Sequence, residues 1–327
     1  MDVFIAGGTG AVGRRLIPLL IESGHRVVAL TRRPDRAAGL ERLGATAAVA
    51  DALDGAALTG AVVRVHPQVV IHELTALTGL RDFQHFDRTF AATNRLRTEG
   101  TDNLLAAARA AGAHRFVAQS YAGWPFARTG GPVKDEEAPL DPDPPRAARE
   151  SLAAIRHLER AVVEAPGMEG LVLRYGGLYG PGTSLEPGGE QFEDLRRRRF
   201  PVVGSGGGIW SFVHVDDAAR ATALAVERGA PGLYNVVDDD PAPVIEWLPA
   251  LAREIAAPPP RRVPAWLARL VAGGYVVAAM TEIRGASNAK ARRELGWEPR
   301  YPSWRAGFAA LAGSTAPPAA TAVASRA

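Results

Sequence analysis

Short apolar runs alternate with stretches of helical periodicity along the first half of the chain. The apolar runs predict strands at Val3–Ala6, Arg26–Leu30, Thr46–Ala50, Val69–His72, Arg115–Gln119 and Gly170–Arg174. The periodic stretches predict helices at Val12–Glu22, Arg36–Leu43, Gly55–Val65, Asn94–Ala111 and Arg146–Glu164. Because the strands are apolar throughout, we expect helices to cover both faces of the sheet. Right-handed crossovers then give an α/β fold with a doubly wound parallel (Rossmann) sheet.

The second half of the chain is rich in glycine and proline from 176 to 208. The elements expected beyond it are a strand at Trp210–Val213 that returns to the sheet, a helix at Asp216–Glu227, a strand at Leu233–Val236 and helices at Pro243–Ile255 and Pro264–Ile283. The predicted units are a sheet domain of residues 1–174 and 209–230, a smaller, discontinuous C-terminal lobe of residues 175–208 and 231–312, and a disordered tail of residues 313–327.

A glycine turn follows the first strand directly. Gly7, Gly10 and Gly13 lie three residues apart, between a strand and a helix. In this context the first glycine allows a tight turn, the second lets a pyrophosphate approach, and the third lets the helix pack on the strand. The free N–H groups and the positive dipole at the helix start then bind phosphate. The sheet domain is therefore predicted to bind a dinucleotide; the alternative is a glycine-rich turn without a ligand.

The end of the second strand indicates which dinucleotide binds. The chain reads Leu30-Thr31-Arg32-Arg33 there, without the Asp or Glu that accepts hydrogen bonds from the ribose 2′-OH of NAD. Arg32 and Arg33 stand where a 2′-phosphate would lie, and guanidinium groups suit phosphate oxygens. NADP is therefore the expected cofactor and NAD the alternative, in which both residues are ordinary surface arginines of an arginine-rich chain.

Composition narrows the functional classes. The formal net charge of +3 gives no reason to expect nucleic-acid binding. The absence of cysteine excludes disulfides, thiolate chemistry and cysteine-zinc sites, and it permits a reducing cytoplasm. The most membrane-like stretch, Trp266–Ile283, is interrupted by Arg269 and Glu282 and broken by Gly273-Gly274, so we expect a buried or partner-facing helix there. A cytoplasmic protein without a membrane span or a metal site is the expectation.

Several further motifs follow in a consistent order. The first three are Asp51-Ala52 after the third strand, Val70-Ile71-His72 in the fourth, and the helical segment Glu99-Gly100-Thr101-Asp102-Asn103-Leu104-Leu105. Residues 174–182 read RYGGLYGPG, and residues 212–217 read FVHVDD. With the glycine turn, these motifs resemble the extended branch of the short-chain dehydrogenase/reductase family, which contains the NAD-dependent epimerases and dehydratases. The resemblance covers roughly Asp2 to Ala312.

The resemblance implies a nicotinamide cofactor and a small-molecule substrate held in the C-terminal lobe. The expected cofactor-binding residues include the two arginines. They are Gly7, Thr9, Gly10, Ala11, Val12, Gly13, Arg32, Arg33, Asp51, Ala52, Leu74 and Thr75. The helices at 94–111 and 146–164 correspond to those that often form a dimer interface in this family. The resemblance therefore also suggests a homodimer.

The catalytic pair that the resemblance implies is missing. Enzymes of this family use a tyrosine as acid or base, and a lysine four residues later lowers the pKa of the phenol. Lys134 and Lys290 are the only lysines, and neither has a tyrosine four residues before it. By alignment of the neighbouring residues, the two positions fall at about Ala148 and Leu152.

The end of the fifth strand retains part of the expected site. Ser120 matches the serine or threonine that hydrogen-bonds the reacting oxygen in the family, and Tyr121 follows it. This tyrosine is a candidate replacement for the lost acid, with positive charge from Arg97, which stands where the family has asparagine, or from Arg174. The alternative is that Tyr121 only packs against the lobe interface.

Other candidate residues have simpler interpretations beside the functional ones. His72 and Glu73 at the exit of the fourth strand are a candidate general base pair, although a structural histidine is common there in the family. His214, with Asp216 and Asp217, suggests a metal, but the same residues match the family's return motif, in which the aspartate caps the next helix. Arg196 to Arg199 would suit an anionic substrate or form a solvated helix face.

We expect an NADP-dependent oxidoreductase or epimerase/dehydratase-like enzyme that acts on a small hydroxyl or carbonyl substrate. Ser120, Tyr121 and His72 are its candidate catalytic residues. Two alternatives remain open. One is a non-redox isomerase, lyase or cyclase on the same fold, and the other is a non-catalytic sensor that binds NADP.

Overall fold

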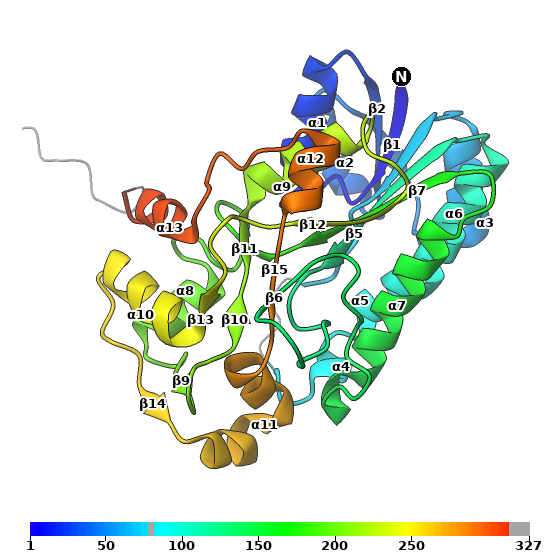
Figure 1. The fold of residues 1–327 in the computed structure, drawn as a ribbon. Helices are drawn as coiled ribbons and strands as arrows, with labels where there is room; N and C mark the ends of the chain where they lie inside the picture. The colour runs from blue at the N-terminus through cyan, green and yellow to red at the C-terminus, as the bar shows by residue number, and fades with distance from the viewer. Residues whose placement is uncertain (78–81, 314–327) are drawn as a thin grey trace, which may run out of the picture.

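Seven parallel strands form the central sheet of the computed structural model, which describes residues 1–77 and 82–313 (Figure 1). Their order is β12-β7-β5-β4-β1-β2-β3, and each neighbouring pair is parallel. The strands are β1 (Asp2–Ala6), β2 (Arg26–Thr31), β3 (Thr46–Val49), β4 (Val69–His72), β5 (Arg115–Tyr121), β7 (Glu169–Tyr175) and β12 (Gly232–Val236). The predicted doubly wound sheet is confirmed. The strand order reverses between β1 and β4, and ligands bind such sheets at this point, outside the carboxyl ends of the strands.

Helices cover both faces of the sheet, as the uniformly apolar strands require (Figure 1). The helices on one face are α1 (Gly13–Glu22), α2 (Ala37–Glu41), α9 (Val215–Ala225) and α12 (Ala289–Leu295), and those on the other are α3 (Gly55–Val63), α6 (Thr101–Ala110) and α7 (Arg149–Val163). In β1, Val3 and Ile5 pack on the first face, and Phe4 and Ala6 pack on the second. Because side chains alternate along a strand, a register slip of one residue would exchange the two cores.

The long helix expected at 94–111 is interrupted in the structure. A turn of π-helix, η2 (Leu96–Gly100), joins α5 (Ala91–Arg95) to α6. The hydroxyl of Thr101 donates to the carbonyl oxygen of Arg97 at 2.8 Å, and Nε2 of His72 lies 3.2 Å from the carbonyl oxygen of Leu96. Such side-chain bonds to helix carbonyls bend helices, and π-turns are frequent at functional sites. The interrupted segment thus lies against the carboxyl end of β4.

The strand expected at Trp210–Val213 does not return to the central sheet. Instead, β10 (Ile209–Trp210) pairs with β13 (Ala242–Pro243), and β11 (Phe212–His214) pairs with β8 (Gly177–Tyr179). A Cβ on Gly176 would lie 2.7 Å from the carbonyl oxygen of Ser211, so only glycine permits this approach of the two segments. These small sheets connect the sheet layer to the C-terminal lobe.

The C-terminal lobe has its own aromatic core, in which Phe192, Phe212, Trp247 and Phe308 are fully buried. Its elements are α8 (Glu190–Arg196), β9 (Val202–Val203), α10 (Val244–Glu254), β14 (Arg262–Val263), α11 (Ala265–Thr281) and α13 (Trp304–Gly313). The remaining elements connect or flank these layers: η1 (Pro34–Arg36), α4 (Phe86–Thr89), β6 (Val133–Lys134), η3 (Arg146–Ala148) and β15 (Gly285–Ala286). Figure 1 shows α10 and α11 beside the sheet layer, on the side where α4 lies.

The boundary predicted at residue 231, between the sheet domain and the C-terminal lobe, does not agree with the packing of the elements that follow it. The strand β12 is the edge strand of the central sheet, and α12 buries Ala291 and Leu295 in the same core as α1 and α9. We therefore propose that residues 232–236 and 289–295 belong to the sheet domain. Residues 314–327, most of the predicted tail, lie outside the described residues.

The helix α11 is bent at a glycine. Gly273 has φ 86° and ψ 171°, values that are not helical, so two helical segments meet there. The sequence prediction that Gly273-Gly274 breaks this apolar stretch agrees with the structure. Within residues 1–77 and 82–313, no helix has the length and apolar character that crossing a membrane requires.

Candidate functional site

The glycine turn between β1 and α1 has no room for side chains. A Cβ on Gly7 would lie 2.5 Å from the backbone of Glu73, and a Cβ on Gly13 would lie 2.4 Å from the carbonyl oxygen of Gly7. Gly7 also has φ 110°, and its carbonyl accepts a hydrogen bond from the Gly10 amide at 3.0 Å. No side chain caps α1, and its first turn contains no acidic residue. The open helix start therefore suits a phosphate-bearing ligand.

The end of β2 presents the two arginines differently. Arg33 pairs with Asp35, with Nη2 2.7 Å from Oδ2, and its amide donates to the hydroxyl of Thr31 at 3.1 Å. Arg32 is exposed and makes no ion pair with any residue that the structure describes. Of the two expected phosphate ligands, Arg32 is thus the available one. Asp51 is exposed after β3, and its Oδ1 accepts a hydrogen bond from the amide of Leu53.

His72 is fully buried, and both its ring nitrogens are engaged. Nδ1 accepts a hydrogen bond from the amide of Leu74 at 3.2 Å, so Nε2 carries the proton that faces the carbonyl oxygen of Leu96 and, at 3.1 Å, the hydroxyl of Thr101. Burial lowers the pKa of this imidazole to about 4. We therefore propose a structural role for His72 in place of the expected catalytic one, because it holds η2 and the loop beginning at Leu74 against β4.

Glu73 is buried directly behind the glycine turn. Its Oε1 accepts a hydrogen bond from the hydroxyl of Tyr175 at 2.7 Å, and its Oε2 is buried without a partner. Burial raises the pKa of this carboxyl to about 8. From the sequence alone, Glu73 is a candidate only as a partner of His72. The two side chains do not act as a pair, because Glu73 bonds to β7.

Ser120 belongs to a buried ion-pair network. Its hydroxyl donates to Oε1 of Glu159 at 2.7 Å. The same carboxylate accepts two hydrogen bonds from Arg174, at 2.8 Å and 2.6 Å. Because this donor is already used, we no longer expect Ser120 to polarise a substrate oxygen, and Arg174 is neutralised by Glu159. The glutamate on α7 was missed by the sequence analysis, since it resembles any polar helix position.

Tyr121 and Arg97 do lie together. Burial raises the pKa of Tyr121 to about 12, and the charge of Arg97 acts against this rise. Arg97 is 8% exposed, and burial lowers the pKa of its guanidinium to about 10. The third group in this space, Tyr275 on α11, had no sequence signal, because it lies in an otherwise apolar helix.

The positions expected for the missing catalytic pair are apolar. Ala148 and Leu152 are fully buried at the start of α7. The two aspartates of the return motif are also not arranged as expected. The carboxylate of Asp217 accepts hydrogen bonds from the amides of Arg300 and Tyr301, while Nδ1 of His214 caps α9. The expectation that an aspartate caps this helix is therefore wrong, because the capping residue is His214. Among the described residues, no group of three or more His, Asp or Glu side chains is suited to hold a metal.

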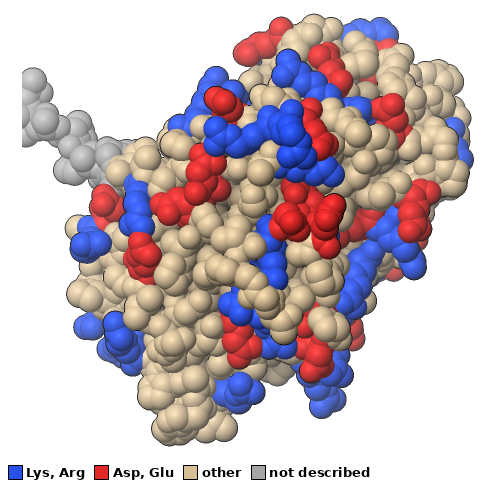
Figure 2. Space-filling model, viewed as in Figure 1, with Lys and Arg blue, Asp and Glu red and all other residues tan. Residues whose placement is uncertain are grey.

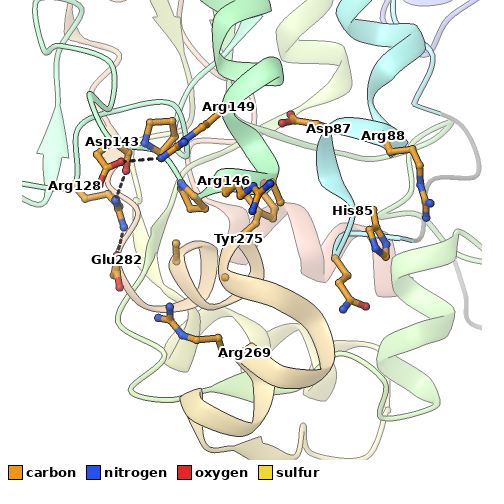
Figure 3. Close-up of a pocket in the computed structure, with 16 residues that line it drawn as sticks. His85, Asp87, Arg88, Arg128, Asp143, Arg146, Arg149, Arg269, Tyr275 and Glu282 are labelled. Carbon is orange, nitrogen blue, oxygen red and sulfur yellow. Dashed lines mark hydrogen bonds and ion pairs between the residues drawn. The ribbon is translucent and has the colours of Figure 1, made fainter.

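A cavity of about 670 Å³ opens between α4, the start of α7 and α11 (Figure 3). It is lined by Gln84, His85, Asp87, Arg88, Arg128, Asp143, Pro144, Pro145, Arg146, Ala147, Arg149, Arg269, Gly274, Tyr275, Ala278 and Glu282. Arg128 pairs with Glu282, whereas Arg146 and Arg269 make no ion pair with any other described residue. Tyr275 lines this cavity, and the charge of Arg97 acts on its phenol.

The fold and the glycine turn define a dinucleotide-binding enzyme of the Rossmann class, and comparison with known proteins specifies the family. The model of the NAD dependent epimerase/dehydratase family matches residues 3–236. A Streptomyces sp protein named 3-diazoavenalumate denitrifying reductase is 48% identical over 311 residues, which cover 94% of this chain and 99% of that protein. The 2-alkyl-3-oxoalkanoate reductase of Stenotrophomonas maltophilia is 29% identical over 79% of this chain and 77% of its own.

The fold is also that of solved structures. The crystal structure of a human epimerase family protein with NADPH has a TM-score of 0.74 at 20% identity, covering 96% of this chain and 99% of that chain. The chain belongs to the NAD-dependent epimerase/dehydratase family, the extended short-chain dehydrogenase/reductases, as its motifs predicted. Its function is of the NAD(P)-dependent oxidoreductase or epimerase type, with a nicotinamide dinucleotide as cofactor and a small molecule as substrate.

Proposed function

We propose that this protein is an NADPH-dependent reductase that removes nitrogen from a small diazo compound. The observation that carries this proposal is the lack of the tyrosine–lysine pair that transfers the proton in this family. No tyrosine precedes a lysine by four residues, and the hydroxyl of Ser120 is bonded to Glu159. Reduction of a carbonyl needs a proton for the developing alkoxide. The Streptomyces relative, whose name denotes reduction of a diazo carboxylate, supports the same substrate class.

Replacement of a diazonium group by hydrogen needs a hydride but no proton donor. When bound, a reduced nicotinamide would supply the hydride for a new C–H bond at the carbon that bears the diazonium group, and the C–N electron pair would leave with N2. The chain's own residues then have to bind the substrate, orient it and exclude water. Ala148 and Leu152 bring no ionisable group to this region, and both are fully buried, so contacts with the substrate have to come from other residues.

The cofactor would be held along the carboxyl ends of the strands. Gly7, Thr9, Gly10, Ala11, Val12 and Gly13 would hold the pyrophosphate, Arg32 and Arg33 the 2′-phosphate, Asp51 and Ala52 the adenine, and Leu74 and Thr75 the nicotinamide end. The free guanidinium of Arg32 supports NADP over NAD. Substitution of Arg32 by Gln should weaken NADPH binding at least tenfold and leave NADH binding unchanged, as measured by calorimetry. Equal losses for both dinucleotides would contradict the assignment.

Turnover tests the proposed reaction. The diazonium salt of 3-amino-4-hydroxybenzoate is mixed with NADPH, with and without protein. We expect protein-dependent NADPH oxidation that matches N2 release one to one. If NADPH binds but only ketones are reduced, the second candidate function holds instead.

That second candidate is carbonyl reduction with Tyr121 as the acid. One observation favours it: the Tyr121 hydroxyl, beside Arg97, makes no hydrogen bond with the described residues. The raised pKa of this phenol makes it a poor proton donor, which is why we place it second. The Stenotrophomonas maltophilia relative is a reductase of oxo compounds by name.

The assembly and the location also belong to the proposal. A homodimer would use α6 and α7, which lie side by side and are bridged by Nε2 of His157 and Oδ1 of Asp102 at 2.7 Å. Light scattering of the purified protein decides between monomer and dimer. A cytoplasmic location, expected from the lack of cysteine, stays a prediction.

A further inference from the structure

Three polar groups without hydrogen-bond partners gather at the carboxyl ends of β4 and β5. They are the guanidinium of Arg97 on η2, the hydroxyl of Tyr121 at the end of β5, and the hydroxyl of Tyr275 on α11. None of the three makes a hydrogen bond or an ion pair with any residue in the ranges 1–77 and 82–313. The bond of His72 to Leu96 holds η2 at the end of β4, beside β5, and the ring centroid of Tyr275 lies 5.8 Å from that of Trp124, in the loop that follows Tyr121. The three groups therefore lie close together, and the charge of Arg97 acts on both phenols.

The charge of Arg97 is not compensated within the fold. Glu159 is the carboxylate that acts on it, yet both oxygens of Glu159 already bind Arg174. Two arginines therefore share one carboxylate and leave one positive charge in excess. A buried cation without a partner is costly, and such groups are normally paired or bind a ligand. A ligand that brings an oxyanion into this space would satisfy Arg97.

Aromatic rings surround the same space. The ring centroid of Tyr275 lies 3.9 Å from that of Phe86 and 5.8 Å from that of Trp124. Phe86 in turn stacks on Phe90 at 4.1 Å. Figure 3 shows Tyr275 projecting from α11 toward the start of α7, where the cavity lies. At these separations the rings pack against one another, and Tyr275, which lines the cavity, is the ring of this group that a flat aromatic ligand can contact.

We propose that Arg97, Tyr121 and Tyr275 bind an oxyanion of an aromatic substrate, either a ring phenolate or a carboxylate attached to the ring. Arg97 pairs with the oxyanion, the two phenol hydroxyls donate to it, and the ring of Tyr275 contacts the substrate ring. That this ligand is the substrate of the reductase rests on the proposed function. The binding itself is independent of turnover and is measured without it.

Two probes separate the sources of the oxyanion: benzoate carries only a carboxylate, and 4-nitrophenol carries only a phenol whose ionised form absorbs in the visible. We expect the wild-type protein to bind benzoate, or to bind 4-nitrophenol and ionise it at lower pH than in buffer. Arg97→Met should weaken the binding at least tenfold, as loss of a hydrogen bond to a charged group does. Tyr275→Phe keeps the ring but removes the hydroxyl, so it should weaken the binding of the probe severalfold.

The controls separate charge recognition from loss of folding. Arg109→Met removes an exposed arginine from the last turn of α6 and should leave both affinities unchanged. Arg97→Lys keeps the charge and should recover part of the binding. Folding of Arg97→Met is judged by its melting transition and by NADPH binding. If it does not fold, the affinities of Arg97→Lys and Tyr275→Phe for the probes test the site instead.

Each outcome has a defined meaning. Dependence on Arg97 for benzoate alone assigns a carboxylate, and dependence for 4-nitrophenol alone assigns a phenolate. Equal affinity of the wild-type protein and the Arg97 variants for both probes overturns the site. A protein that binds the probes through Arg97 but does not reduce the diazonium salt refutes the proposed function and leaves the site standing.

Discussion

At the scale of single residues, Glu73 is the titratable group directly behind the glycine turn of the candidate cofactor site. Its raised pKa of about 8 keeps the carboxyl protonated at neutral pH. A negative charge there would oppose the positive end of α1 and repel a pyrophosphate. The neutral form therefore leaves the phosphate site attractive, and cofactor binding should weaken above about pH 8.

The same carboxyl makes stability depend on pH. The ordinary glutamate pKa of 4.5 describes the unfolded chain, and burial raises the pKa to about 8 in the folded one. The folded state then holds the proton more tightly, so this contribution is fully present below about pH 4.5 and is lost as pH rises through 8. We predict that Glu73→Gln reduces the fall of the free energy of unfolding between about pH 5 and 9, measured by urea titration.

Part of that fall should remain, because burial also raises the pKa of Asp238 to about 8. The exposed Glu41→Gln is the matched control and should leave the profile unchanged. A profile of Glu73→Gln that coincides with the wild-type profile would refute the assignment of a buried, protonated Glu73.

Gly13 provides a test of the phosphate site itself. An added Cβ would meet the carbonyl oxygen of Gly7 at 2.4 Å, so Gly13→Ala must push the turn away from α1. We predict a loss of NADPH affinity of tenfold or more and a destabilisation of about 1–3 kcal/mol. Gly274→Ala, where an added Cβ has open space, should change neither calorimetric binding nor melting. Unchanged NADPH affinity of Gly13→Ala would count against cofactor binding at this turn.

The glycine turn of the candidate cofactor site could be predicted because its signal is local. Gly7, Gly10 and Gly13 are close in sequence and act on one turn. Arg97 and Tyr275 are far apart in sequence, and only the packing of α11 against the sheet domain places them together. Their contact has no periodic or motif signature, so the sequence could not reveal it.

At the scale of elements, α7 depends on a cap from another helix. Asp87 on α4 accepts hydrogen bonds from the amide of Glu150 at 3.0 Å and from that of Ser151 at 2.8 Å. This carboxylate satisfies two free N–H groups at the helix start and favours the positive end of its dipole. It also fixes the start of α7, which borders the cavity.

Removal of this cap should therefore destabilise the fold. Asp87→Ala is expected to lower the free energy of unfolding by about 1 kcal/mol, the usual value for losing a helix N-cap. The loss should be measurable as a lower melting temperature. Asp35→Ala, which breaks only the exposed pair with Arg33, should have a smaller effect. Equal shifts in the two variants would show that the cap contributes little.

The elements themselves were mostly predictable, and the exceptions have physical causes. The apolar runs at Val69–His72 and Gly170–Arg174 became β4 and β7 because both faces are buried. The turn of π-helix at η2 depends on bonds from His72 and Thr101, which a hydrophobic pattern does not contain. The pairing of β11 with β8 depends on the close approach that Gly176 permits, which no local pattern shows.

At the scale of the whole molecule, the sheet domain and the C-terminal lobe are joined by polar contacts as well as by core packing. Figure 2 shows acidic and basic side chains interspersed over the visible face, without a large area of one sign. A buried connection lies beneath: the carboxylate of Asp217 on α9 accepts hydrogen bonds from the amides of Arg300 and Tyr301, at 2.8 Å and 2.9 Å. It ties the segment that leads to α13 onto the sheet layer.

This connection should matter for the stability of the entire fold. Asp217 is fully buried, so Asp217→Ala leaves two amides without acceptors and should lower the free energy of unfolding by about 2–4 kcal/mol. Asp217→Asn keeps one acceptor oxygen and should lose less, as measured by urea titration. A loss below about 0.5 kcal/mol for Asp217→Ala would show that the segment is held by apolar packing alone.

Transfer of label from the cofactor to the substrate tests the central claim most directly. NADPH deuterated at the transferable position of the nicotinamide is incubated with the protein and the diazonium salt of 3-amino-4-hydroxybenzoate, and the product is analysed by mass spectrometry. The account predicts 4-hydroxybenzoate with one deuterium at the ring carbon that carried nitrogen. Product without deuterium, or oxidation of NADPH with the diazonium group intact, would contradict it.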